Sequence, residues 1–136
     1  MTTEEITQRY PGDWLFCSNS DHRWHTYARM KIGPRVNLWV GIVKYPDIAP
    51  ERLMQAPFRV VLEFGGMFAD REYMINTVED VAQKAGELIA KQILVGEIVH
   101  VEQLPSWLKS VVKEQLQLRI DTVSGVLSNI SVEDNK

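Results

Sequence analysis

The sequence predicts a single α+β domain in which an antiparallel sheet of about five strands carries helices packed on one face. Several short segments alternate apolar and polar side chains with the period of two that is typical of half-buried strands. Turn-forming residues separate these segments. Two later segments repeat apolar residues every three or four positions, as amphipathic helices do. The predicted order is α-β-β-β-(α)-β-β-α-(β)-α, where parentheses mark the less regular elements.

The first predicted elements are short. Thr2 and Glu5 have the spacing of a capping box, which predicts a helix that ends before Pro11-Gly12. The stretch DWLFCS, residues 13–18, then predicts a strand. A run of small polar residues follows it and predicts a turn.

A second strand is predicted over residues 22–32, where the alternation is cleanest. Its apolar face should belong to the core and carries Trp24, Thr26, Ala28, Met30 and Ile32. Its opposite face carries Arg23, His25, Tyr27, Arg29 and Lys31. No acidic residue interrupts the chain between positions 22 and 35, although the protein as a whole is acidic.

Gly33-Pro34 predicts a tight turn into a return strand over residues 36–45. The turn sets a register of paired residues: Arg29 opposite Trp39, Tyr27 opposite Gly41, Arg23 opposite Tyr45, Met30 opposite Leu38, and Ala28 opposite Val40. Apolar residues thereby face apolar residues, and cations face aromatic rings. A slip of one residue would mix the two faces, which favours this register.

The rest of the chain supplies the remaining elements. Residues 46–55 predict a brief helix or turn, and residues 57–64 and 67–75 predict a hairpin around Gly65-Gly66. Thr77 is predicted to cap a helix whose apolar stripe runs to Ile93. Residues 96–104 predict a short edge strand, and a final helix is predicted over about 106–129. The single domain should span residues 1–130, followed by a flexible polar tail at 131–136.

Composition and charge narrow the classes of function. A net charge of −3 argues against duplex nucleic acid as a partner, since such proteins are usually basic. The chain has one cysteine, Cys17, so no intramolecular disulfide forms and a cytoplasmic setting is predicted. No apolar run reaches membrane-spanning length, so no membrane partner is predicted.

The order of the elements over residues 1–94 resembles that of type III secretion chaperones and their relatives. The resemblance is one of element order, without a diagnostic motif. It implies a homodimeric protein-binding module and leaves the final helix unexplained.

The first candidate site is the polar face of the second strand, with residues of its neighbours. It combines cationic and aromatic side chains: Arg23, His25, Tyr27, Arg29, Lys31, Trp39, Tyr45 and Arg59. Guanidinium groups bind phosphates and carboxylates, and aromatic faces stack on bases or on arginine. The face is compatible with a protein partner, with a small anionic ligand, or with a solvated surface in which arginine packs over Trp39.

Catalytic and metal chemistry find less support. Cys17, His22, His25 and His100 match no zinc pattern, and three-residue spacing places the first two histidines on opposite faces of a strand. A Cys17–His25 nucleophile pair would need a thiol that is predicted to face inward. The acids of the second hairpin, Glu63, Asp70 and Glu72, lack a matching base. No metal, cofactor or catalytic residue is therefore predicted.

The second candidate site is an apolar seam on the final helix. Its members step by three and four residues, close to a heptad: Val112, Leu116, Ile120, Val123 and Leu127. Docking on the domain's own sheet, self-association and binding in a partner's groove all remain open for this seam. Trp107, just inside the helix, is predicted to anchor it.

These features predict a non-enzymatic protein-binding module that uses the cationic-aromatic face. Chaperone, adaptor and inhibitor roles all fit, including the small inhibitors encoded by phages and plasmids. The alternative is a binding protein for a nucleotide or another small anionic ligand on the same face.

Overall fold

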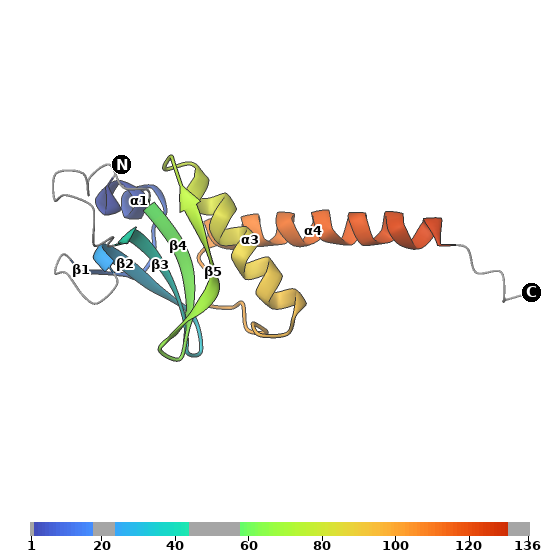
Figure 1. Ribbon diagram of the computed structural model, residues 1–136, viewed down its shortest axis with the longest axis horizontal. Helices are drawn as coiled ribbons and strands as arrows, with labels where there is room; N and C mark the ends of the chain where they lie inside the picture. Colours follow the sequence, from blue (N-terminus) through green and yellow to red (C-terminus); the bar gives the residue numbers. More distant parts are fainter. Residues whose placement is uncertain (1, 18–23, 44–57, 131–136) are drawn as a thin grey trace, which may run out of the picture.

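The computed structural model describes residues 2–17, 24–43 and 58–130. Its elements are α1 (Thr3–Arg9), β1 (Trp14–Cys17), β2 (Trp24–Gly33), β3 (Val36–Val43), β4 (Phe58–Phe64), β5 (Met67–Ile75), α3 (Asp80–Leu94) and α4 (Ser106–Asn129). Figure 1 shows the strands side by side, α3 against the sheet, and α4 running out from the domain. The predicted single α+β domain is confirmed.

The sheet is an antiparallel meander in the order β1-β2-β3-β4-β5. The register predicted for the first hairpin is confirmed, with Arg29 opposite Trp39 and Tyr27 opposite Gly41. The predicted pair of Arg23 and Tyr45 lies outside the described residues, as does the helix or turn predicted for residues 46–55.

The prediction for Trp24 is wrong: it does not share the core face with Ala28. Trp24 pairs with Val43, while Thr26 pairs with Ile42, so His25 is an extra residue in β2. Such a β-bulge reverses the alternation of side chains on its far side. Trp24 therefore lies on the opposite face of the sheet, where it packs with Trp39.

One apolar cluster joins the other face of the sheet to all three described helices. α1 contributes Ile6, and α4 contributes Leu108 and Val112. The predicted stripe of α3 is confirmed, and its fully buried members include Val81, Ala85, Leu88 and Ile89. Three helices thus cover one face of the sheet, as an α+β fold requires.

The helix starts agree with the sequence in two cases of three. The side chain of Thr2 accepts a hydrogen bond from the backbone N–H of Glu5 at 3.1 Å, as a capping residue does. Ser106 begins α4 as predicted. Thr77 does not cap α3, because a turn intervenes in which the N–H of Thr77 donates to the Asp80 carboxylate at 3.3 Å.

The strand predicted over residues 96–104 is also wrong. These residues form turns and an irregular connection between α3 and α4. Gly96 has a φ of 81°, which ends the helical path of α3 in a left-handed conformation.

Among the described residues, no helix has the length and apolarity needed to cross a membrane.

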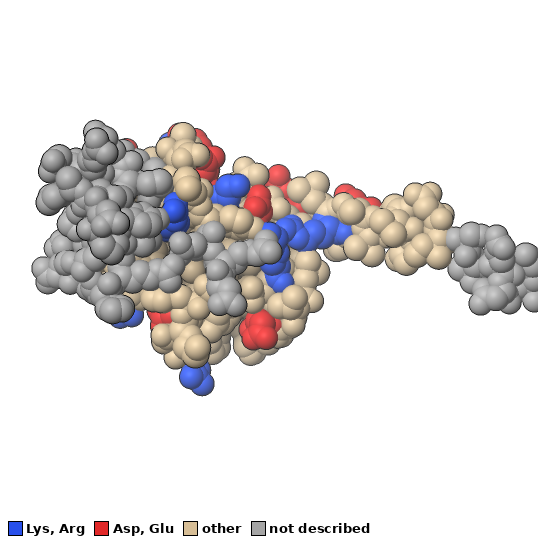
Figure 2. Space-filling model, viewed as in Figure 1, with Lys and Arg blue, Asp and Glu red and all other residues tan. Residues whose placement is uncertain are grey.

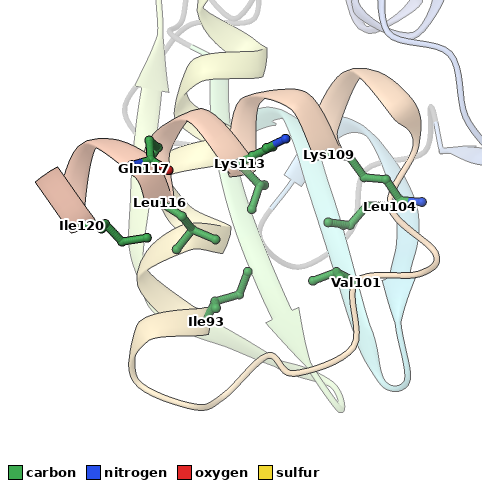
Figure 3. A pocket seen from close by; sticks show the side chains of 9 residues that line it. Ile93, Val101, Leu104, Lys109, Lys113, Leu116, Gln117 and Ile120 are labelled. Carbon is green, nitrogen blue, oxygen red and sulfur yellow. The ribbon is translucent and has the colours of Figure 1, made fainter.

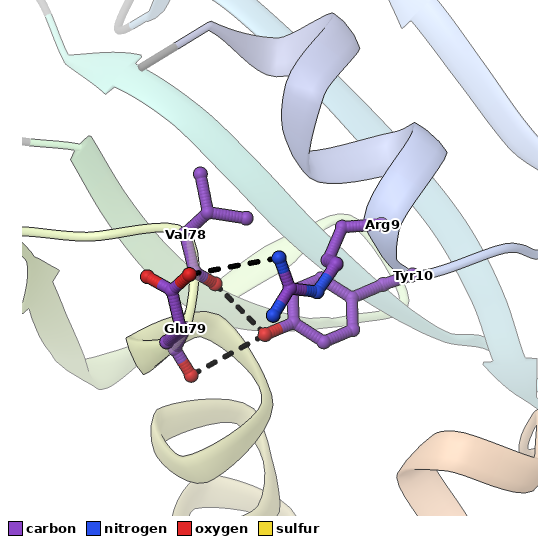
Figure 4. A network of polar contacts seen from close by, with 4 residues as sticks. All are labelled: Arg9, Tyr10, Val78 and Glu79. Carbon is purple, nitrogen blue, oxygen red and sulfur yellow. Dashed lines mark hydrogen bonds and ion pairs between the residues drawn. The ribbon is translucent and has the colours of Figure 1, made fainter.

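Tyr10 ties the start of the chain to both later helices. Its phenol lies at the start of α3 (Figure 4), where it donates to the carbonyl oxygen of Val78 at 2.8 Å and lies 3.3 Å from that of Glu79. The Tyr10 ring centroid lies 4.8 Å from that of Trp107, whose indole N–H donates to the carbonyl oxygen of Pro11 at 2.8 Å. These two contacts hold Trp107, which lies at the start of α4, as the sequence predicted.

The substitution Tyr10→Phe tests this contact. Loss of the phenol leaves the carbonyl of Val78 without its donor, and we expect the free energy of unfolding to fall by about 1 kcal/mol at pH 7. Urea denaturation of the wild type and the variant measures this difference.

A pH series gives a second check on the same variant. Burial raises the pKa of the Tyr10 phenol, although the guanidinium of Arg9 opposes the shift. The unfolded chain then loses the phenol proton first, so wild-type stability declines as the pH rises above about 10. The stability gap between the wild type and Tyr10→Phe should therefore narrow above that pH. A constant gap would contradict the assignment.

Candidate binding surfaces

The described members of the predicted cationic-aromatic face do share one face of the sheet. Arg29, Trp39 and Val61 lie in register across β2, β3 and β4. Tyr27, Lys31 and Arg59 occupy neighbouring positions on that face. Arg23 and Tyr45 lie outside the described residues, as does the side chain of His25.

This face is packed with aromatic rings. Trp24 and Trp39 are buried, and their ring centroids lie 5.7 Å apart. Tyr27 stacks on Trp39 at 4.3 Å, and Phe68 meets it edge-on at 4.9 Å. The ring faces that could stack on a base are therefore largely occupied by one another.

A buried carboxylate completes this cluster. Glu63 is 9% exposed, and its Oε1 accepts a hydrogen bond from the indole N–H of Trp39 at 2.5 Å. Its Oε2 accepts the backbone N–H of Gly66 at 3.0 Å, in the turn that joins β4 to β5. Both oxygens thus have donors, as a buried carboxylate requires. The carboxylate of Glu63 thereby holds the Trp39 ring in place, and the turn holds the carboxylate.

The cationic side chains of the face have different surroundings. The guanidinium carbon of Arg29 lies 5.7 Å from the centroid of the Trp39 ring, a cation–π contact. Lys31 is exposed, whereas Arg59 is half-buried. The described geometry gives Arg29 and Trp39 a packing role, and the binding role of the face stays a prediction.

The structure describes only some of the residues considered for metal binding and catalysis. No group of three or more His, Cys, Asp or Glu residues there could hold a metal ion. His100 is exposed, with its Nδ1 3.9 Å from the carboxylate of Glu102. The side chains of Cys17, Asp70 and Glu72 lie outside the described part.

The α4 seam divides into a docked half and an exposed half. Val112 is buried in the core, and Leu116 packs against it. Ile120, Val123 and Leu127 are 53%, 56% and 61% exposed. Every residue from position 120 to 130 is exposed, and Figure 1 shows this part of α4 projecting from the domain. Docking thus accounts for only the first half of the predicted seam.

The projecting part is also poor in charge. The sequence has no Asp, Glu, Lys or Arg between positions 122 and 130. In the face seen in Figure 2, acidic and basic side chains lie along the inner part of α4 and are absent from its outer end. An exposed helix normally carries charges on its solvent side. An uncharged, partly apolar one is typical of a surface that contacts another molecule.

A groove lies beside α4 where the helix leaves the domain. We call it the α4 groove; it has a volume of about 370 Å³ and is lined by Ile93, Val101, Leu104, Lys109, Val112, Lys113, Leu116, Gln117 and Ile120. Figure 3 shows apolar side chains from α3, the connection and α4 pointing into the same space. Leu116 and Ile120 belong to both the groove and the seam, so the two form one continuous surface.

Close helix packing places α4 at this groove. A side chain on Gly86 of α3 would overlap Val111 of α4, so a glycine at that position lets the helices approach closely. Gly125, by contrast, lies in open space. The heptad spacing revealed the seam, but no sequence signal revealed the groove, because Ile93 and Val101 come from other segments.

The hydrogen bond between Trp39 and Glu63 generates a prediction. Trp39→Phe removes the indole donor and leaves a buried carboxylate oxygen without a partner, so we expect unfolding free energy to fall by about 2 kcal/mol. A double-mutant cycle with Glu63→Leu, which has no hydrogen-bond acceptor, separates this bond from the lost ring area. Urea denaturation of the four proteins should give a coupling energy of about 1 kcal/mol or more. A coupling near zero would show that the bond contributes nothing.

Comparisons with known proteins do not place the chain in a family. No family model, no curated protein and no solved structure matches it. The similarity to type III secretion chaperones accordingly stays a resemblance in the order of elements.

Proposed function

We propose that this chain is a non-enzymatic protein-binding module that takes an amphipathic helix of its partner into the α4 groove. One observation carries the proposal: the exposed apolar residues of α4 continue without a break into an apolar groove on the domain. Exposed apolar surface that continues into a groove is the arrangement used in helix-in-groove recognition. Chaperone, adaptor and inhibitor roles are all compatible with it.

The composition of the groove favours a polypeptide over a small anion. Its floor is made by aliphatic side chains, including Ile93, Leu104 and Leu116. A site for a small anionic ligand needs several polar groups that converge on it. The length also fits a helix, since residues 116–129 of α4 extend for roughly 20 Å at 1.5 Å per residue.

The charges of the groove indicate the chemistry of its partner. Lys109 and Lys113 are its charged lining residues, and both are exposed. Their aliphatic stems extend the apolar surface, while their ammonium groups reach solvent. The preferred partner is therefore a helix with an apolar stripe and acidic flanking residues. Rim charges of this kind act mainly on partner choice and on the rate of association.

The setting proposed for this activity is the cytoplasm. The single cysteine, Cys17, supports it, because a chain with one thiol needs no oxidising compartment to fold. A homodimer is a separate part of the proposal, and the peptide-binding activity does not depend on it.

A peptide-binding measurement tests the proposal. The probe is a fluorescent 15-residue helical peptide with leucines at heptad positions and glutamate flanks, and its comparator has lysine flanks. We expect the dilute wild-type protein to bind the acidic peptide more tightly. Ile120→Asp, which places a carboxylate in the groove, should weaken binding by roughly tenfold or more. Fluorescence anisotropy reports both affinities.

A residue on the same helix serves as the matched control. Leu118 is 54% exposed but does not line the α4 groove, so Leu118→Asp should leave the affinity unchanged. Replacing Lys109 and Lys113 with Glu should reverse the preference between the two peptides. Equal binding by the wild type and Ile120→Asp would refute the proposed site.

A further inference from the structure

We infer that the helix taken up by the α4 groove is α4 of a second copy of this chain. The two helices run antiparallel, so that residues 120–130 of each copy lie along the groove of the other. This inference rests on the proposed function, since it names the partner of the same surface.

The spacing of the exposed residues supports helix–helix pairing. From Leu116 on, the seam residues Leu116, Ile120, Val123 and Leu127 are separated by four, three and four residues. This is the a/d pattern of a coiled coil, in which two helices bury a shared seam. The domain itself covers only the first of these four, and the other three are each more than half exposed. The seam is therefore longer than the surface that its own domain offers.

The helical state of the projecting part also indicates a partner. Residues 122–126 read Thr-Val-Ser-Gly-Val, all of which have weak helix propensity. They are exposed, so packing within the chain does not compensate for this weakness. Helices of poor propensity are normally stabilised by burial of one face. A second helix along the seam supplies that burial.

An antiparallel arrangement uses the groove, whereas a parallel one leaves it empty. In an antiparallel coiled coil, a positions meet d positions of the other helix. Ile120 then lies opposite Val123 of the second copy, and Leu116 lies opposite Leu127 of the second copy. The end of each helix is thereby directed back toward the other domain, where Ile93 and Val101 line the groove. The pairing is self-complementary, as a two-fold dimer requires.

The charges are compatible with this pairing. The positions that flank the exposed seam hold Gln117, Arg119, Ser124 and Val126, so each copy brings one charge to the flanks. The guanidinium of Arg119 already donates to the backbone carbonyl and side-chain oxygen of Gln115 at 2.9 and 3.1 Å.

Light scattering coupled to size-exclusion chromatography tests the dimer on the full chain. We expect a mass of twice the 15.6 kDa of the chain at micromolar concentration, falling toward one copy on dilution. Val123→Asp combined with Leu127→Asp should give a monomer without loss of fold, because both side chains are exposed within one copy. Leu118→Asp, equally exposed but off the seam, should remain dimeric.

Spin labels distinguish the two orientations. In a Cys17→Ser background, a single nitroxide label is attached at Thr122→Cys or at Asn129→Cys. Pulsed electron paramagnetic resonance then measures the distance between the labels of the two copies. The antiparallel pairing places the first pair close together and the second pair farther apart by roughly 20 Å, at 1.5 Å per residue along each helix. Two short distances would overturn the antiparallel arrangement.

The outcomes separate this inference from the proposed function. A wild-type monomer at all concentrations would overturn the dimer, while acidic-peptide binding that depends on Ile120 would still support the binding module. A dimer that persists in the Val123→Asp, Leu127→Asp variant would place the contact elsewhere and overturn the inference. The inference would be supported if the Val123→Asp, Leu127→Asp variant were a monomer, Leu118→Asp were a dimer, and the spin labels gave a short distance at position 122 and a long one at position 129.

Discussion

The close approach of α3 and α4 at Gly86 determines the path of the last helix and, with it, the candidate binding surface. Val111 lies where a larger residue than glycine would place its side chain. This contact and the Trp107 anchor hold the first half of α4 on the domain. Because a helix is stiff over this length, its second half continues straight out and leaves its apolar residues uncovered. The groove forms at the point where the helix and the domain separate.

The two faces of the sheet contribute differently to the molecule. One face is covered by helices, and the main core lies there. The other carries a smaller aromatic cluster around Trp39, stabilised by the buried carboxylate of Glu63. That second cluster explains why a face rich in arginine and aromatic residues is not simply solvated. Its rings pack on one another, and Arg29 lies over them.

Much of the fold could be predicted from the sequence, because alternation of side chains determines which residues share a face. The register of β2 with β3 followed from it and from a short turn. The bulge at His25 could not be predicted, since one extra residue leaves no mark in composition, and it moved Trp24 to the other face. The role of Glu63 was missed for a related reason, as its partners come from another strand and from a turn. For α4, spacing predicted the seam, whereas the length that stays exposed depends on where the domain ends.

The strand order also has a consequence for how the chain folds. Each strand of the sheet pairs with its neighbour in sequence, so most of the pairing joins residues that are close along the chain. Topologies of this kind have low contact order and fold quickly compared with sheets that need crossovers. The contacts of Tyr10 with Val78 and Trp107 are of another kind, because they join positions far apart in the chain. We expect the hairpins to form early and the closure around Tyr10 to form late, so that the first and last helices dock only on a sheet that already exists.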